Sequence, residues 1–168
     1  MPDPRDPAAF HDAARLCLDC GLCCDGTLFD QVELQPGDLP KALSARGLKI
    51  KKGKWFNQPC AGLCGTLCQL YQHRPTRCRQ FQCGQYRGVA AGEISFETAA
   101  DRIRAVREEE AGLKARLTAA GGGNVRKSLA RRHATALEAQ AGVEGATAPL
   151  TESMNRFRER LEAWFGLG

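Results

Sequence analysis

Residues 17–24 read Cys17-Leu-Asp-Cys20-Gly-Leu-Cys23-Cys24, and this stretch decides how the N-terminal half folds. A Cys-x-x-Cys step forms a tight knuckle whose two sulfurs can reach one metal ion. Gly21 permits the backbone conformation that such a turn needs. Two consecutive steps place three thiolates on one side of a short loop, as in zinc sites and iron–sulfur sites. We therefore predict a metal centre built on this loop.

The adjacent pair Cys23-Cys24 constrains that centre further. Neighbouring side chains point apart in most backbone conformations, so two adjacent thiolates seldom bind the same tetrahedral ion. We predict that Cys23 and Cys24 bind different ions, or different corners of a larger cluster. More than one metal ion per chain follows from this prediction.

All nine cysteines of the 168-residue chain lie between Cys17 and Cys83. The chain starts with a polar, proline-broken segment that lacks the apolar run of a signal peptide, so we expect a cytoplasmic location. Cytosolic thiols are kept reduced, and clustered cysteines there are more often metal ligands or catalytic groups than disulfides. An odd number of cysteines also fits complete disulfide pairing poorly.

The cysteine spacing resembles the cysteine-cluster family often called YkgJ-like, which is described as a zinc- or iron-chelating domain. The shared pattern is C-x-x-C-x-x-C-C, a lone Cys, and then C-x-x-Y-x-x-R-P-x-x-C-R-x-F-x-C, and the resemblance spans roughly residues 17–83. Outside its cysteines the pattern is matched by Tyr71, Arg74, Pro75, Arg79 and Phe81. The resemblance implies that eight thiolates are metal ligands, namely Cys17, Cys20, Cys23, Cys24, Cys60, Cys68, Cys78 and Cys83.

Cys64 has no counterpart in the family pattern, and we predict that it is a protonated thiol that binds no metal. His73 lies midway between Cys68 and Cys78 and is an alternative ligand. The pattern does not require a histidine there, so we expect an exposed or hydrogen-bonded side chain.

The ligand set leaves the metal open between zinc and iron. Eight thiolates divide into two four-coordinate sites, as zinc would be held. They also suit one cubane iron–sulfur cluster plus a zinc ion, or a larger polynuclear cluster with bridging sulfurs. Soft thiolates bind Cu(I) as well, so copper is a third option. The spacing alone does not separate these alternatives.

The charge of the first half fits a thiolate cluster. Residues 1–92 hold 12 Lys and Arg and 8 Asp and Glu, and eight thiolates with two divalent ions bring the formal charge to zero. We interpret the basic excess as the counter-charge of the thiolates, so the composition does not favour a nucleic-acid partner. Arg74, Arg77 and Arg79 are expected to donate hydrogen bonds to sulfur. We expect no membrane partner, because no stretch approaches the roughly 18 apolar residues of a span. A protein partner stays open.

The composition changes near Gly92 and predicts two regions. Residues 1–92 are predicted to form a cysteine-cluster metal-binding domain, and residues 93–168 a helical region packed on it. The fold class is α+β: an irregular, metal-stabilised, cysteine-rich N-terminal half with a short hairpin, followed by three C-terminal helices. Apolar spacing and turn residues predict the helices at 96–120, at 125–141 and from about 147–151 onward. In the first half they predict a helix over 39–46, capped by the turn at Asp38, and a strand over 48–52 that turns at Gly53.

These features favour a metalloprotein with a structural, metal-handling or redox-sensing role. The alternative is an iron–sulfur enzyme or an accessory subunit, because a related domain occurs within flagellin lysine methylases. No methyl-donor site and no Ser/His/Asp set stand out, so the expectation leans away from catalysis. A polar pocket or an open coordination position beside the cluster would favour the enzyme.

Overall fold

The computed structural model describes residues 7–166, with the side chains of residues 12–166. The described residues form seven α-helices, one turn of 3-10 helix and two antiparallel sheets of two strands each, which confirms the predicted α+β class. No helix in this part of the chain is long and apolar enough to cross a membrane. The polar start, on which the expected cytoplasmic location rests, lies in residues 1–6, outside the described part.

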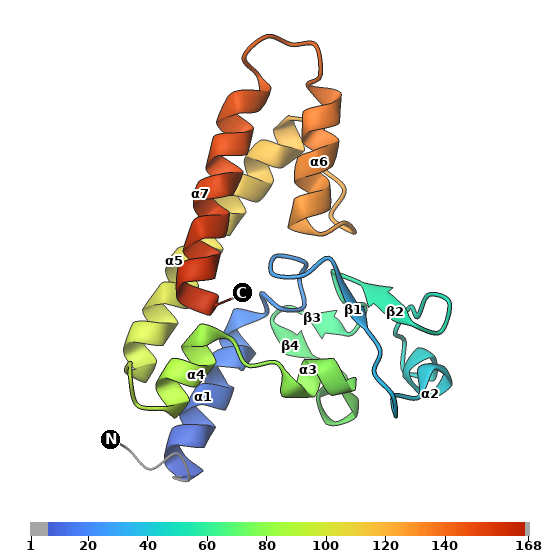
Figure 1. The fold of residues 1–168 in the computed structure, drawn as a ribbon, viewed down its shortest axis with the longest axis vertical. Helices are drawn as coiled ribbons and strands as arrows, with labels where there is room; N and C mark the ends of the chain where they lie inside the picture. Colours follow the sequence, from blue (N-terminus) through green and yellow to red (C-terminus); the bar gives the residue numbers. More distant parts are fainter. Residues whose placement is uncertain (1–6, 167–168) are drawn as a thin grey trace.

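Figure 1 shows the order of the elements. The α-helices are α1 Pro7–Cys20, α2 Pro40–Ala45, α3 Thr76–Gln80, α4 Gly84–Ala90, α5 Phe96–Ala119, α6 Leu129–Ala139 and α7 Thr147–Phe165. The 3-10 turn is η1 Tyr71–His73, and the strands are β1 Gln31–Glu33, β2 Trp55–Asn57, β3 Leu63–Cys64 and β4 Leu67–Cys68. Strand β1 pairs with β2, with Val32 opposite Phe56, and β3 pairs with β4.

Helices α1, α4, α5, α6 and α7 form a helical body with one apolar core. Leu16 of α1 and Leu22 lie in the same core as Leu113 of α5 and Phe157 of α7. The long helices α5 and α7 run side by side, and α1 and α4 lie at one end of them (Figure 1). The core therefore joins the N-terminal cysteine loop to the C-terminal helices.

The ends of the C-terminal helices follow from their caps. Helix α5 begins where predicted, because the Ser95 side chain accepts a hydrogen bond from the Thr98 N–H at 3.0 Å. Helix α7 was also predicted correctly. Helix α6 begins four residues later than predicted, at Leu129, because Ser128 caps it. Val125 is 72% exposed and is not part of the apolar face that we predicted for this helix.

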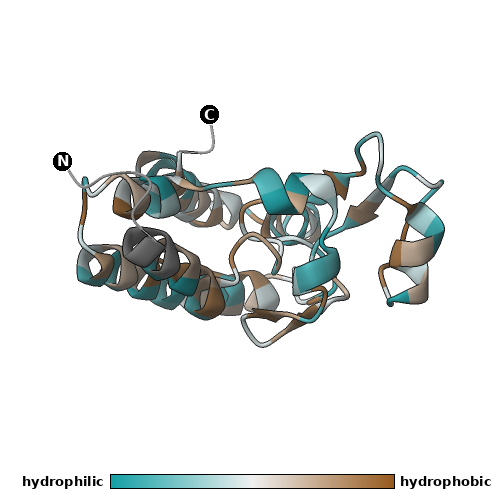
Figure 2. Cartoon of the chain, turned by 90° about the horizontal axis from the view of Figure 1, so that it is seen from below, coloured by the Kyte–Doolittle hydropathy of each residue, from teal (hydrophilic) through white to brown (hydrophobic). Residues whose placement is uncertain are grey.

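Residues 28–82 form a small lobe with a second apolar core, made by Val32, Leu43, Leu48, Phe56 and Leu70. Figure 2 shows the lobe, with α2 at its far end, at the opposite end of the molecule from the helical body. The lobe is irregular, because its strands are only two or three residues long. Its position leaves the cysteine-bearing segments between the two cores.

Two local predictions for the small lobe need correction. The predicted strand over 48–52 is wrong: it makes one bridge, Lys51 to Trp55, while β2 pairs with β1. The helix over 39–46 is confirmed as α2, but Asp38 does not cap it. Instead the Asp38 carboxylate accepts hydrogen bonds from the backbone N–H groups of Gln35 and Thr76, at 2.8 and 2.9 Å, and so ties the turn to α3.

Candidate metal centre

A cavity of about 760 Å³ lies between the helical body and the small lobe. Its walls include Leu16, Ile103 and Phe165 from the body and Phe56 and Leu70 from the lobe. All eight cysteines that were predicted as ligands line this cavity, namely Cys17, Cys20, Cys23, Cys24, Cys60, Cys68, Cys78 and Cys83. The tertiary structure thus brings together cysteines from five separate stretches of the chain, namely residues 17–24, Cys60, Cys68, Cys78 and Cys83.

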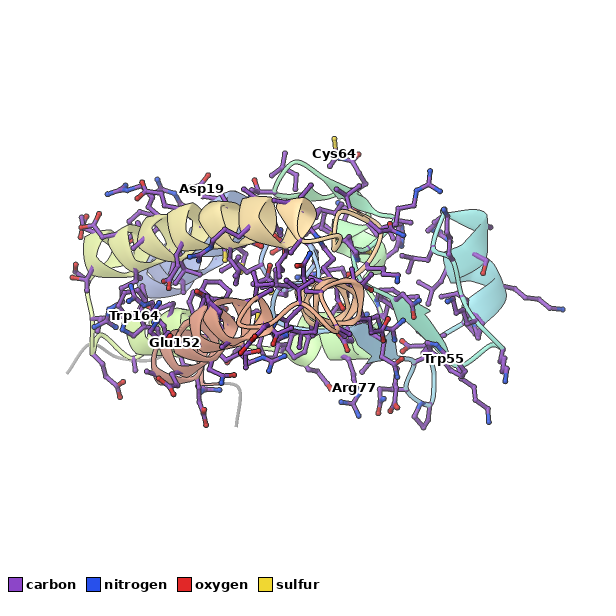
Figure 3. The ribbon with its side chains drawn as sticks, turned by 90° about the horizontal axis from the view of Figure 1, so that it is seen from above. Asp19, Trp55, Cys64, Arg77, Glu152 and Trp164 are labelled. Atoms are coloured by element: carbon purple, nitrogen blue, oxygen red, sulfur yellow. The ribbon has the colours of Figure 1, made fainter. Side chains whose placement is uncertain are left out.

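Cys64 and His73 do not line the cavity, and both are exposed. Figure 3 shows the Cys64 sulfur pointing out from the surface. The hairpin of β3 and β4 explains this placement, because Cys64 and Cys68 lie on different strands joined by Gly65 and Thr66. Cys68 therefore faces the cavity, and Cys64 faces solvent.

Four of the cavity cysteines meet where α1 packs against α4. Cys17 and Cys20 are three residues apart in the last turn of α1 and share one face of it, so this first Cys-x-x-Cys step is helical and not the loop that we predicted. Gly21, at φ 68°, ends the helix and turns the chain so that Cys23 follows. Cys83 stands at the N-cap of α4. Burial is the largest cause that raises the pKa of Cys17, Cys20 and Cys23, and the charge of Cys83 adds to it in all three, although for Cys23 the charge of the adjacent Cys24 adds more.

The other four meet against the small lobe. The Cys60 N–H donates to the Cys24 carbonyl at 2.7 Å, which holds the first cysteine loop against the second group. Cys60, Cys68 and Cys78 pack on the apolar core of the lobe. Burial, together with the charges of these three thiols, raises the pKa of Cys24 to about 12. Cys24 therefore interacts with the lobe cysteines as well as with the adjacent Cys23, whose pKa it raises.

Six of the cavity thiols favour the protonated form at neutral pH, because burial raises the pKa of Cys17, Cys20, Cys23, Cys24, Cys60 and Cys78. Burial raises the pKa of Cys20 and Cys78 to about 12, and neighbouring cysteines add to the effect in both cases. Since metals bind thiolates, an ion entering the cavity must displace these protons. Among residues 12–166, no three His, Cys, Asp or Glu side chains stand ready to hold an ion.

The predicted arginine–sulfur hydrogen bonds are not among the contacts of the described residues. The Arg74 Nε donates to the Tyr71 carbonyl at 3.0 Å, Arg79 donates to the Thr76 hydroxyl at 3.3 Å, and Arg77 lies 3.9 Å from Glu33. Arg74 still acts through its charge, which lowers the pKa of Cys17 and Cys78 against the larger effect of burial. Backbone N–H groups donate to sulfur instead: that of Gly62 lies 3.4 Å from Cys60 Sγ, and that of Leu22 donates to Cys20.

Helix α5 clamps the first cysteine loop from the other side. The Arg107 Nη1 donates to the Cys20 carbonyl at 2.7 Å, and Lys114 Nζ lies 3.4 Å from Asp25 Oδ2. Glu110 is buried between them, where it forms an ion pair with Lys114 at 2.5 Å and accepts a hydrogen bond from the Thr27 hydroxyl. Sequence analysis missed this network, because Thr27 and Glu110 are 83 residues apart and share no motif.

The carboxylates of this clamp titrate differently. Burial, together with the charge of Glu110, raises the pKa of Asp25 to about 6. Burial also acts to raise the pKa of Glu110, but hydrogen bonds from Lys114 and Thr27 outweigh it and the net shift is downward. Glu110 is therefore the charged partner of Lys114, and Asp25 takes up a proton first as the pH falls.

Two buried glutamines complete the cavity wall, and sequence analysis predicted a role for neither of them. Gln58 and Gln85 are 2% and 1% exposed, and the Oε1 atom of each has no hydrogen-bond partner. The Gln85 amide nitrogen donates to the Trp164 carbonyl, which fixes the orientation of its amide. Each glutamine lies two residues from a cavity cysteine, Cys60 or Cys83.

The fold and this cavity define a small cysteine-rich protein with a thiol-lined site. Residues 16–103 match the family CxxCxxCC, described as "Putative zinc- or iron-chelating domain", and the chain belongs to this family. The match extends beyond the span that we predicted, to Ile103 of α5, which lines the cavity. The family description supports a bound metal. No curated protein and no solved structure matches the chain.

Proposed function

We propose that the protein binds at least two metal ions, zinc or iron, through eight cavity thiolates. The observation that carries this proposal is that the eight family cysteines face one cavity, whereas Cys64 points to solvent. Soft thiolates suit zinc and iron–sulfur clusters alike. All nine cysteines are free thiols, so a reducing compartment such as the cytoplasm would keep them available.

The eight thiolates form two sets of four, and each set has its own support. Cys17, Cys20, Cys23 and Cys83 lie where α1 meets α4, and Cys24, Cys60, Cys68 and Cys78 lie against the small lobe. The proposal assigns Cys23 and Cys24 to different sets, because adjacent side chains point apart in most backbone conformations. A four-thiolate set is the ligand number of a structural zinc site or of a cubane cluster.

A structural, metal-handling or redox-sensing role suits this arrangement. The first set lies beneath the helical body, where Leu16 and Ile103 close the cavity wall. Four thiolates on an ion leave no coordination position for a substrate. Bound metal would also join the two parts of the molecule, because the second set combines Cys24, from the loop after α1, with three cysteines that pack on the lobe core.

Metal analysis of protein purified without oxygen tests the proposal. We expect at least two metal ions per chain, with acid-labile sulfide present if the metal is iron in a cluster. Cys17→Ser with Cys20→Ser should remove the ion or cluster of the first set only. Cys60→Ser with Cys68→Ser should remove that of the second set only. Cys64→Ser is the matched control and should leave the metal content unchanged.

Other outcomes would contradict this assignment in distinct ways. Loss of all metal from either double variant would indicate one polynuclear centre in place of two sets. Fewer than two ions per chain in the unaltered protein would refute the occupancy. Metal loss from Cys64→Ser would show that the ligand set is wrong.

The size of the cavity favours a second candidate, an iron–sulfur enzyme or an accessory subunit of one, for example in protein methylation. About 760 Å³ falls within the range of small-molecule sites and exceeds what two ions need. The unpaired Oε1 atoms of Gln58 and Gln85 would accept hydrogen bonds from a ligand. Adding imidazole or cyanide to the metal-loaded protein distinguishes the candidates: an open coordination position shifts the absorption spectrum, and closed thiolate sets do not.

A further inference from the structure

The chain separates much of its positive charge from the thiol cavity. Residues 39–92 contain ten Lys and Arg and no Asp or Glu. Six of the ten lie within residues 41–54, which we call the basic tip: Lys41, Arg46, Lys49, Lys51, Lys52 and Lys54. All six are exposed, and none lines the cavity. These six charges therefore do not surround the thiolates, and our interpretation of the basic excess does not hold for them.

The basic tip is also free of compensating acids. Among the described residues, no ion pair joins any of its six basic side chains to a carboxylate. The acidic side chains of the small lobe have other partners. Asp38 accepts hydrogen bonds from the N–H groups of Gln35 and Thr76, and Glu33 lies near Arg77. Asp30 accepts a hydrogen bond from the Ser128 hydroxyl. The tip thus presents six formal positive charges to solvent.

The backbone that carries these charges is ordered and projects from the molecule. The Lys51 N–H donates to the Trp55 carbonyl at 2.7 Å, and the Lys54 N–H donates to the Lys51 carbonyl at 2.9 Å, which closes a tight turn. Leu43 and Leu48 anchor the tip in the apolar core of the lobe. Helix α2 and the adjoining turn stand at the end of the lobe away from the helical body (Figures 1 and 3).

We propose that the basic tip binds the phosphate backbone of duplex DNA without sequence preference. DNA carries a negative charge about every 1.7 Å of its axis, which matches a dense patch of unpaired cations. Five of the six cations are lysines, which act as point charges and lack the fork of arginine that reads a base edge. A projecting helix and turn also fit the major groove, which is about 12 Å wide.

Other polyanions fit the tip less well. Single strands bind by stacking on exposed rings, but Trp55 is half-buried, with Lys52 over its ring. Protein interfaces draw their affinity from aromatic and arginine anchors and are depleted in lysine. A lipid surface would be held by apolar insertion as well as by charge. Beside the tip, the described lobe offers one large exposed apolar side chain for insertion, Leu39, which is 67% exposed.

Fluorescence anisotropy with the full-length, metal-loaded protein and a labelled 20-base-pair DNA duplex tests the proposal. We expect the logarithm of the association constant to fall linearly with the logarithm of the salt concentration. Lys51→Glu with Lys52→Glu and Lys54→Glu should weaken binding about tenfold or more at 0.1 M salt and reduce the slope by about 3. Arg104→Glu with Arg116→Glu and Arg156→Glu changes the net charge equally but lies on α5 and α7, and it should have a small effect.

The proposal concerns residues outside the cavity and is therefore independent of the metal. Metal content and circular dichroism should be unchanged in both triple variants, which checks that they fold. No duplex binding at 0.05 M salt, or equal losses in both variants, would overturn the proposal. So would tighter binding to phosphatidylserine vesicles or to poly-L-glutamate than to the duplex, because either would assign the tip to a membrane or to an acidic protein.

Discussion

At the scale of single residues, the thiol cavity separates Cys64 from the other cysteines. The other eight line the cavity and burial raises the pKa of six of them, whereas Cys64 lies outside it; Cys17 is also exposed, but at the edge of the cavity. Exposed thiols react with alkylating reagents, and buried or metal-bound thiols are protected.

We therefore expect iodoacetamide to modify Cys64 first in the metal-loaded protein. Mass spectrometry of proteolytic fragments would show one modified cysteine per chain at early times. Cys64→Ser should abolish this early label, and chelation should expose further cysteines to it. Early labelling of Cys60 or Cys68 in the loaded protein would contradict the proposed ligand set.

Gly26 is a second position where one residue matters. Its φ of +87° is in the left-handed region, and a Cβ there would lie 2.9 Å from the Cα of Ser128. Gly37, at φ +96°, has nothing within 4 Å of such a Cβ. Both positions carry the backbone penalty of about 1–2 kcal/mol for a residue other than glycine, but only Gly26 adds a steric clash with backbone.

Gly26→Ala should therefore lower the free energy of unfolding by clearly more than Gly37→Ala does. We expect about 1 kcal/mol for Gly37→Ala and about 3 kcal/mol for Gly26→Ala, from backbone strain plus overpacking. Urea denaturation of both variants measures the difference. Equal losses would mean that the loop does not pack against the start of α6 as described.

At the scale of elements, α5 does more than fill the core. Its Arg107, Glu110 and Lys114 side chains contact the loop that carries Cys20 and Cys24. These three residues follow Ile103, where the family match ends. The helix fixes the loop before any metal binds.

Glu110→Ala should loosen this loop. It leaves Lys114 without its closest partner and Thr27 without an acceptor, and removing one member of a part-buried network costs about 2 kcal/mol. Urea denaturation should show that loss, together with faster metal transfer to a chelator. Glu108→Ala, an exposed change on the same helix, is the control and should alter neither. An unchanged rate of metal transfer in Glu110→Ala would show that α5 does not contribute to metal retention.

At the scale of the whole molecule, the thiols couple stability to pH. Burial raises the pKa of Cys20, Cys24 and Cys78 from 9.0 to about 12, so the folded, metal-free protein favours the neutral thiol. Their contribution to stability is complete below pH 9 and is lost as the pH rises towards 12.

We expect the metal-free protein to lose free energy of unfolding between pH 8.5 and 10.5. The metal-loaded protein should lose less, because its cysteines are already ionised and bound. Thermal melting of both forms across this range measures the difference. Parallel curves for the two forms would contradict the assignment of buried, neutral thiols.

Metal removal should also affect the two cores differently. The helical body has its own large core, whereas the small lobe has short strands and five core side chains. Structural zinc contributes roughly 10–16 kcal/mol in small zinc peptides, as much as the net stability of many domains. Chelation should therefore unfold residues 28–82 and keep most of the helical circular dichroism. Hydrogen exchange would locate the residues that unfold. Uniform protection of the chain after verified metal removal would contradict the predicted unfolding of residues 28–82.

The sequence alone determined the local features. The α+β class, the bounds of α5 and α7 and the membership of the family follow from caps, apolar spacing and cysteine spacing, which act within a few turns of chain. The helical state of Cys17–Cys20 and the pairing of β2 with β1 did not follow, since packing and partners distant in the chain decided them.

Only the tertiary structure decided which charges and sulfurs are neighbours. It grouped Cys83 with Cys17 and Cys24 with Cys60, placed Glu110 under the first cysteine loop, and set the basic tip apart from the thiolates. A sequence records how many charges and thiols a chain carries. Electrostatic energy depends on the distances and the burial between them, and these exist only once the two cores have packed.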